Sequence, residues 1–245
     1  MRSFRIPIVT DRGKGPCGSN EWWTRSRKRV KYPSLMSWMA SARHGVREAP
    51  GGLALVQELL NTRATMHYGA DLLLNPDDAQ RWLTEALGTW SRVSGLPAPT
   101  LLISSNDMRS LRRLRTTFEN VILTAGSEGL GGALPPADVP VSLVPDADGW
   151  VRMVPTGRGT RWLASALWAE ALLAQQAGLW ARLKLCHNGD CRAAFFDTSR
   201  NNSGVWHDVS TCGNTANLRA FRERKRLLGG SGGQPQLPGP PPSLR

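Results

Sequence analysis

Residues 186–212 read CHNGDCRAAFFDTSRNNSGVWHDVSTC and hold three of the four cysteines in the 245-residue chain. The spacing is C-x4-C, then fifteen residues, then H-x4-C, and the candidate ligands are Cys186, Cys191, His207 and Cys212. Each close pair can come from one tight turn, so little loop entropy is lost when the second pair returns to complete a tetrahedron. Thiolate and imidazole donors together favour zinc over magnesium or calcium. The pattern therefore predicts a structural Zn²⁺ site closed by four protein ligands.

Two other interpretations of these residues are open. The cysteines could be small buried residues beside a coincidental His207, but clustered cysteines with a nearby histidine in an intracellular chain are typical of a metal site. His187 is a second candidate ligand, yet it follows Cys186 directly and would need unfavourable geometry to reach the same ion. We therefore prefer the four-ligand interpretation.

The residues between the two ligand pairs predict a β-hairpin. Residues 194–196 would form one strand, residues 198–204 the turn, and Val205 and Trp206 the returning strand, so that Phe196 and Trp206 cover the metal. A module this small buries too little apolar surface to fold alone, and zinc coordination would supply most of its folding free energy, on the order of 10 kcal/mol. Without metal the module is expected to be unfolded.

A basic helix is predicted directly after the last ligand. Residues 213–215 read as a capping sequence, and the helix should run from Thr215 to Leu228. Successive helical residues are about 100° apart, which places Leu218, Phe221 and Leu228 on one side and Arg219, Arg222 and Arg226 on the neighbouring stripe. Such a stripe can lie along phosphates, and a solvated surface helix is the alternative interpretation.

The charge of the chain favours a polyanionic partner. Thirty-one Lys and Arg against nineteen Asp and Glu give a formal net charge of +12 and a sequence pI near 10.7. Nucleic acid and anionic membranes are the usual partners of such a charge. No stretch has the length and apolarity of a membrane span, and the N-terminal residues lack a signal-peptide apolar core. We therefore expect a soluble, cytoplasmic protein with no membrane partner.

The composition divides the chain into four segments. Residues 1–50 are basic, lack hydrophobic periodicity and are predicted to be a disordered arm, which either touches nucleic acid or is a solvated tail. Residues 51–184 are predicted to form a helical regulatory domain and residues 185–228 the zinc module. The Gly- and Pro-rich tail, residues 229–245, is expected to be disordered.

Four helices and one hairpin are predicted between residues 52 and 185. The first is LALVQELLNT, residues 53–62, and the second begins at Pro76 behind the N-cap Asn75 and runs to about Leu87, with Trp82 and Leu83 buried. The third spans about 105–122, the hairpin 140–155, and the last helix 161–185, with a core face of Leu163, Leu167, Ala171 and Ala174.

The third helix carries an arginine cluster on the faces opposite its apolar stripe. The cluster is Arg109, Arg112, Arg113 and Arg115. It could bind an anion, but a charged helix surface opposite a core is the commoner arrangement. We expect the second interpretation to hold.

The segment from Cys186 to Arg226 resembles the CGNR zinc-finger family of bacterial proteins. The FxDTSRN sequence at 195–201, the tryptophan before the third ligand and the C-G-N beginning at Cys212 carry the resemblance, and LALVQELLNT is weakly similar to the opening helix of that family's N-terminal domain. That domain is described as a stress-induced transcription regulator and called ABATE. Two residues depart from the family, which usually has Cys where this chain has His207 and Arg where it has Thr215. Because His is a normal zinc ligand, coordination should survive as Cys3His.

The resemblance and the residues together predict a mainly α fold with a small β-hairpin, in which a helical N-terminal domain precedes a small α+β zinc module. The resemblance implies a DNA-binding transcriptional regulator whose partner is double-stranded DNA. The residues expected to contact DNA are Arg200, Asn201, Arg219, Arg222, Arg224, Lys225 and Arg226.

Other functions stay open at this point. The alternative is a zinc-stabilised protein-interaction adaptor whose basic helix meets an acidic partner. An enzyme is not expected, because the sequence has no P-loop, GxSxG or HExxH motif and therefore no candidate catalytic residue. A homodimer and a small-molecule effector are compatible with a regulator, but no residue indicates either.

Overall fold

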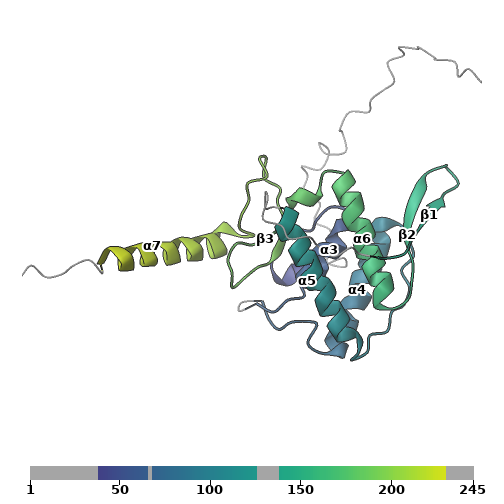
Figure 1. The fold of residues 1–245 in the computed structure, drawn as a ribbon, viewed down its shortest axis with the longest axis horizontal. Helices are drawn as coiled ribbons and strands as arrows, with labels where there is room; N and C mark the ends of the chain where they lie inside the picture. The colour runs from purple at the N-terminus through teal and green to yellow at the C-terminus, as the bar shows by residue number, and fades with distance from the viewer. Residues whose placement is uncertain (1–37, 66–67, 126–137, 230–245) are drawn as a thin grey trace, which may run out of the picture. The chain divides into compact units, whose positions relative to one another are not determined.

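The computed structural model describes residues 38–65, 68–125 and 138–229, so the predicted arm before residue 38 and the tail from residue 230 lie outside them. The helices of the described part are α2 (Met39–Arg43), α3 (Leu53–Leu60), α4 (Pro76–Ser94), α5 (Asp107–Ala125), α6 (Thr160–Gln176), the short η1 (Trp180–Arg182), the π-helical η2 (Val209–Gly213) and α7 (Asn214–Gly229). The strands are β1 (Val141–Pro145), β2 (Val151–Pro155), β3 (Leu183–Leu185) and β4 (Ala194–Phe196) (Figure 1). They pair as two antiparallel hairpins, β1–β2 and β3–β4. The predicted mainly α fold is confirmed, and so is the hairpin predicted at residues 140–155, which is β1–β2.

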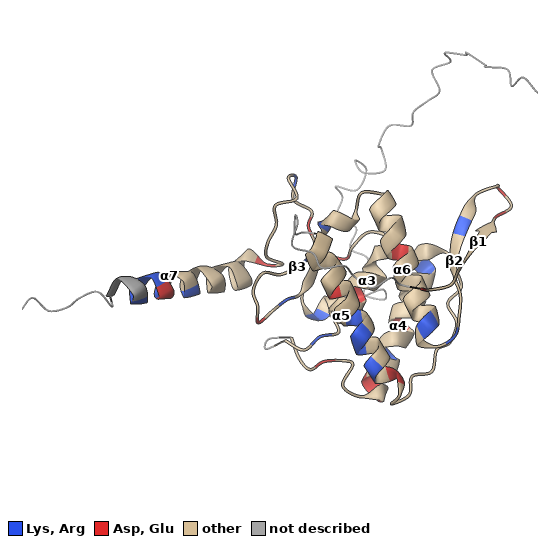
Figure 2. Cartoon of the chain, viewed as in Figure 1, with Lys and Arg blue, Asp and Glu red and all other residues tan. Residues whose placement is uncertain are grey.

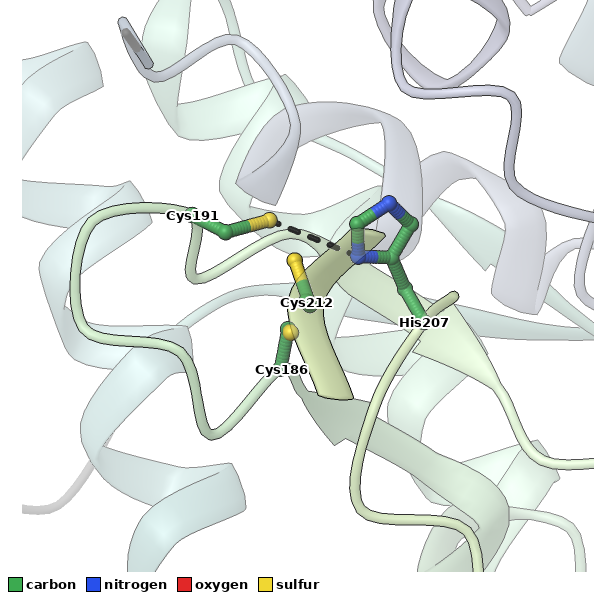
Figure 3. Close-up of side chains that lie close together, drawn as sticks. All are labelled: Cys186, Cys191, His207 and Cys212. Atoms are coloured by element: carbon green, nitrogen blue, oxygen red, sulfur yellow. Dashed lines mark hydrogen bonds between the residues drawn. The ribbon is translucent and has the colours of Figure 1, made fainter. Parts of the chain in front are cut away.

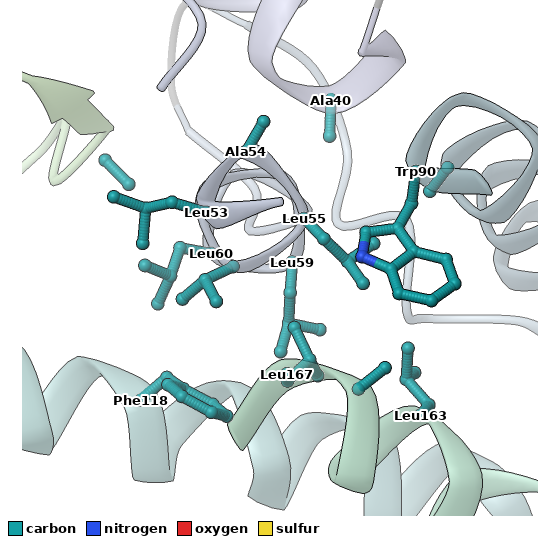
Figure 4. Close-up of a cluster of buried hydrophobic side chains, with 14 of the residues drawn as sticks. Ala40, Leu53, Ala54, Leu55, Leu59, Leu60, Trp90, Phe118, Leu163 and Leu167 are labelled. Atoms are coloured by element: carbon teal, nitrogen blue, oxygen red, sulfur yellow. The ribbon is translucent and has the colours of Figure 1, made fainter. Parts of the chain in front are cut away.

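The core forms around α3, whose eight side chains are all buried. Side chains of α3 point toward Leu163 and Leu167 of α6 and toward Phe118 of α5, while Trp90 comes from α4 (Figure 4). The predicted core faces of the second and last helices are buried as expected, at Trp82, Leu83, Leu87, Leu163, Leu167, Ala171 and Ala174. None of the described helices has the length and apolarity needed to cross a membrane.

The start of α4 agrees with the sequence prediction, whereas the C-terminal ends of α4 and α6 do not. Asn75 caps α4 as predicted, since its side-chain oxygen accepts the Asp78 N–H at 2.9 Å. The helix continues beyond Leu87 to Ser94 and stops where Gly95 adopts φ 70°. The predicted helix 161–185 is too long: α6 ends at Gln176, because Gly178 takes a left-handed φ of 68°, and the chain reaches the first ligand through η1 and β3.

The predicted arm, residues 1–50, extends too far, because residues 38–50 belong to the folded body. Trp38, Ala40 and Ala49 are buried, and the N–H groups of Ala40 and Ser41 at the start of α2 donate to the Glu58 carboxylate at 2.6 and 2.8 Å. Burial raises the pKa of Glu58. The contacts join positions 17 and 18 residues apart, which no local periodicity reveals.

The expected surface position of the arginine cluster is wrong for one of its members. Arg115 is 4% exposed, and its guanidinium binds the Asp71 carboxylate through two hydrogen bonds of 2.8 and 2.6 Å. It also donates to the Thr62 hydroxyl at 2.9 Å. A bidentate ion pair with further hydrogen bonding offsets the desolvation of the buried guanidinium. Arg109 and Arg113 are exposed as predicted.

The hairpin of the zinc module is not the predicted one. β4 pairs with β3 in the register Leu183↔Phe196 and Leu185↔Ala194, whereas Val205 and Trp206 form no strand. Leu183, Leu185 and Phe196 belong to the same core as the helices. Leu183 and Leu185 provide a better-buried partner for β4 than the segment before His207, in which Val205 is exposed and Trp206 is half-buried.

Side-chain amides of α3 and of the residue following it hold the free edge of β4. The Asn61 amide donates to the Ala194 carbonyl at 3.0 Å and accepts the Ala194 N–H at 2.8 Å, as a neighbouring strand would. The Gln57 amide donates to the same carbonyl at 3.2 Å. All three residues are buried. The zinc module is therefore docked on the helical body by directional hydrogen bonds as well as by apolar packing.

We expect Asn61→Leu to lower the free energy of unfolding by about 2 to 4 kcal/mol, because it leaves the buried Ala194 N–H without an acceptor. Urea unfolding of the zinc-loaded protein, followed by circular dichroism, measures the change. The matched control is Asn106→Leu, at an exposed position before α5, which should change stability by less than about 0.5 kcal/mol. Equal stabilities for the two variants would contradict the docking role of Asn61.

Candidate metal centre

Four side chains converge where the two ligand pairs meet. The Sγ atoms of Cys186, Cys191 and Cys212 and a ring nitrogen of His207 all lie within 4.8 Å of one another. The three cysteines are buried and the histidine is half-buried. Figure 3 shows the sulfurs and the imidazole facing a common point, with Cys191 Sγ 3.4 Å from His207 Nδ1. The predicted ligand set is thus brought together in full.

A tight turn positions the first pair. The Cys191 and Arg192 N–H groups both donate to the Asn188 carbonyl at 2.9 Å, and Cys186 N donates to Ala193 O at 2.8 Å. Arg192 takes a left-handed φ of 49°, which returns the chain to β4. The Asn188 side-chain amide, buried in the turn, donates to Cys212 Sγ at 3.4 Å. The turn therefore positions Cys186 and Cys191 and also forms a hydrogen bond with Cys212 of the second pair.

The second pair is set by Asp208 and not by the predicted capping residues 213–215. Asp208 is the N-cap of η2, and its carboxylate accepts the N–H groups of Ser210 and Thr211. Cys212 lies within η2, which continues into α7 at Asn214. The continuous helical segment formed by η2 and α7 therefore begins before the fourth ligand. Cys212 lies in the first part of this segment.

The donor set fits a zinc ion. Zinc–sulfur bonds of about 2.3 Å and zinc–nitrogen bonds of about 2.0 Å in a tetrahedron place the donor atoms about 3.5 to 3.8 Å apart. The spacings in the cluster, 3.4 Å for one pair and at most 4.8 Å for all, match that requirement with small adjustments. Cys186, Cys191, Cys212 and His207 would hold the ion, the last through Nδ1. With four protein donors the site is a structural one.

The sulfurs also need a cation for electrostatic reasons. A hydrogen bond from the Cys191 thiol lowers the pKa of Cys186 to about 3, and the same contact raises the pKa of Cys191. Two adjacent thiolates repel each other, so one proton is retained between them. A divalent cation can replace that proton and stabilise all the thiolates at once.

Three side chains pack around the donor cluster. They are Val46, Tyr68 and Trp206, of which only the last was predicted to cover the metal. Phe196, the other predicted cover, lies in the main core instead, because β4 turns it toward the helices. His187 is exposed, lies outside the cluster, and packs its ring edge-to-face on Trp206 at 5.9 Å. Val46 and Tyr68 are distant in sequence from the motif, which carries no signal for either.

The loop after β4 is held by an ion pair between the buried Asp197 and the half-buried Lys184. Asp197 accepts Lys184 Nζ at 2.8 Å and the N–H groups of Ser199 and Gly204 at 2.8 and 2.7 Å. Although burial opposes ionisation, these hydrogen bonds lower the pKa of Asp197 well below its usual range. A Cβ on Gly204 would lie 2.9 Å from this carboxylate, so only glycine leaves room for it. The loop that carries Arg200 is therefore rigidly closed at its base.

The residues predicted to contact DNA fall into two groups. Arg200 and Asn201 are exposed in the loop, and the five basic residues of α7 are exposed along the helix. Among the described residues no hydrogen bond or ion pair joins the two groups. Arg219 forms an ion pair with Asp190 in the first ligand turn, and Arg226 one of 3.4 Å with Glu223.

Metal stoichiometry tests the ligand set directly. We expect the purified protein to bind one zinc per chain and Cys191→Ser to lose most of it, because three protein donors hold zinc less tightly than four. Cys17→Ser is the matched control, since Cys17 is the cysteine outside the motif, and should retain the full amount. Elemental analysis after dialysis gives the ratio. Equal zinc contents in both variants would rule out Cys191 as a ligand.

Metal removal should affect the chain unevenly. Because β3 and β4 share the core of the helices, we expect chelation to expose residues 205–213 while α4 and α6 stay folded. We therefore expect the metal-free protein to lose structure only around the second ligand pair, and not throughout the zinc module as the sequence alone predicts. Hydrogen exchange with and without a chelator measures this. Equal loss of protection in α4 would contradict it.

Comparison with known proteins agrees with this geometry. Residues 182–225 match the sequence model of the CGNR zinc finger family. No curated protein matches the chain. The matched range begins just before β3 and ends within α7, so it contains all four metal-binding side chains. Residues 182–225 are therefore a CGNR zinc finger with a Cys3His ligand set.

Proposed function

We propose that the protein is a transcriptional regulator of the bacterial cytoplasm that binds double-stranded DNA through α7 and the zinc finger. The observation that carries the proposal is the charge of α7. Its residues include five basic side chains and one acidic side chain, a net charge of +4, and all six are exposed. Such a helix attracts phosphates, and the helical body would take the regulatory role. The proposal includes no catalytic activity.

The base of α7 is held at the metal centre. The helix is continuous with η2, which contains Cys212, and the Arg219–Asp190 ion pair ties its second turn to the loop between the first two ligands. We therefore infer that Arg219 mainly positions α7 and does not mainly contact the DNA. Figure 2 shows in blue the positions of the basic residues along the distal part of α7.

Three clustered basic side chains define the DNA-facing side of α7. At about 100° per residue, Arg222, Lys225 and Arg226 lie within about 100° of one another on α7, and Arg224 lies on the other side. Arg222 and Lys225 have no ion-pair partner among the described residues. The three clustered side chains can meet consecutive phosphates, while Arg200 and Asn201 offer a separate contact from the loop.

An adaptor function is the second candidate, and one observation favours it. Leu218 and Phe221 of α7 are 54% and 58% exposed and lie three residues apart, on neighbouring turns of one helix side, where a protein partner could cover both. A protein partner would depend on these two residues, whereas phosphate contacts would depend on the basic ones. Pull-down from a nuclease-treated lysate with wild type and Phe221→Ser separates the two functions.

We expect the zinc-loaded protein to bind random-sequence duplex DNA with an affinity that falls about 40- to 150-fold between 50 and 200 mM NaCl, for three to four phosphate contacts. Fluorescence anisotropy at several salt concentrations gives the slope. Arg222→Gln and Lys225→Gln should each reduce the slope by about one unit.

The matched control is Arg113→Gln, which removes an exposed arginine from α5 and should leave the slope unchanged. Binding that is absent, or that does not depend on salt, would contradict the proposal. An equal effect of the α5 and α7 substitutions would show that net charge alone, and not α7, attracts the DNA.

A further inference from the structure

The two ring nitrogens of His207 face different parts of the molecule. Nδ1 lies 3.4 Å from Cys191 Sγ, on the side of the sulfur cluster. Nε2 lies 3.3 Å from the hydroxyl of Tyr68, which is 139 residues earlier in the chain. The two rings meet edge-to-face at 5.9 Å. One histidine thus contacts both the zinc finger and the helical body.

The chemistry of imidazole fixes the direction of the second contact. When Nδ1 gives its lone pair to a metal, the proton of the neutral ring lies on Nε2, which must then donate. The Tyr68 hydroxyl is the acceptor in reach. It also hydrogen-bonds the side chain of Thr211, the residue before the fourth ligand. Tyr68 therefore contacts the ligand His207 and the residue that precedes the ligand Cys212.

The helical body holds Tyr68 in place for this role. Its N–H donates to Thr65 Oγ1 at 3.1 Å, within a turn closed by the Thr65–Gly69 bridge. Its ring packs on the ring of His44 at 4.7 Å. His44 in turn lies 3.3 Å from the Asn61 carbonyl, and burial lowers the pKa of His44 to about 4, so that ring is neutral.

We propose that Tyr68 is the outer-sphere partner that orients the metal ligand His207, so that the helical body, and not the zinc finger alone, completes the metal centre. Ligand histidines hold their ring plane and tautomer through such a second hydrogen bond. The chain then gains metal affinity from a residue outside the finger. By thermodynamic reciprocity, metal binding stabilises the turn that carries Tyr68.

The test is a double-mutant cycle on metal affinity with the full chain. Tyr68→Phe keeps the ring that packs on His44 and removes only the hydroxyl. We expect it to weaken zinc binding about 10- to 100-fold in competition with a chromogenic chelator. His207→Cys supplies a thiolate in place of the imidazole, and in that background Tyr68→Phe should change the affinity less than about twofold, because no Nε2–H is left to orient.

A spectroscopic measurement separates orientation from general stability. With Co²⁺ as the probe, Tyr68→Phe should shift the visible absorption bands of the His207 protein and leave those of the His207→Cys protein in place. Thermal unfolding of the metal-free forms should be equal with and without the hydroxyl. An unchanged zinc affinity in Tyr68→Phe, or an equal loss in both backgrounds, overturns the proposal, since Tyr68 would then act through packing alone.

Discussion

The convergence of three sulfurs and one imidazole on one point determines the C-terminal part of this molecule. The core beside the donors consists of only four buried residues, Cys186, Cys191, Ala193 and Cys212. β4 packs in the helical core, but these few side chains bury too little apolar surface to balance the conformational entropy of the remaining residues around the ligands. Metal coordination must supply the difference, which is why the donors themselves occupy the buried positions.

The zinc finger is nevertheless not an independent unit. Its β3–β4 hairpin contributes to the helical core, and buried amides of Gln57 and Asn61 satisfy the edge of β4 at Ala194. These polar residues help to explain why LALVQELLNT is buried on all sides although four of its ten residues are polar. The helical part of the protein thus holds the zinc finger in position through β4. The zinc finger in turn positions the start of α7, because η2 contains Cys212 and continues into α7. Any regulation by the body would reach the helix through these contacts.

The sequence predicted what depends on neighbouring residues and missed what depends on distant ones. The ligand spacing and the Asn75 cap are local patterns, and both are found as expected. The helical pattern predicts an exposed Arg115 because its partner Asp71 is 44 residues away, and it predicts the wrong partner for β4 because strand pairing depends on burial that no short stretch of sequence contains. The role of Tyr68 likewise arises only when two distant turns meet.

The two elements of the proposed DNA-binding surface are both held by ion pairs within the protein. Asp197 and Lys184 close the loop that carries Arg200, and Asp190 holds Arg219 near the start of α7. Exposed ion pairs such as the second contribute little stability by themselves, so their value lies in orientation. A binding surface that is already ordered loses less conformational entropy on association. The same net charge on flexible segments would attract DNA equally well at long range but would bind it less tightly at contact.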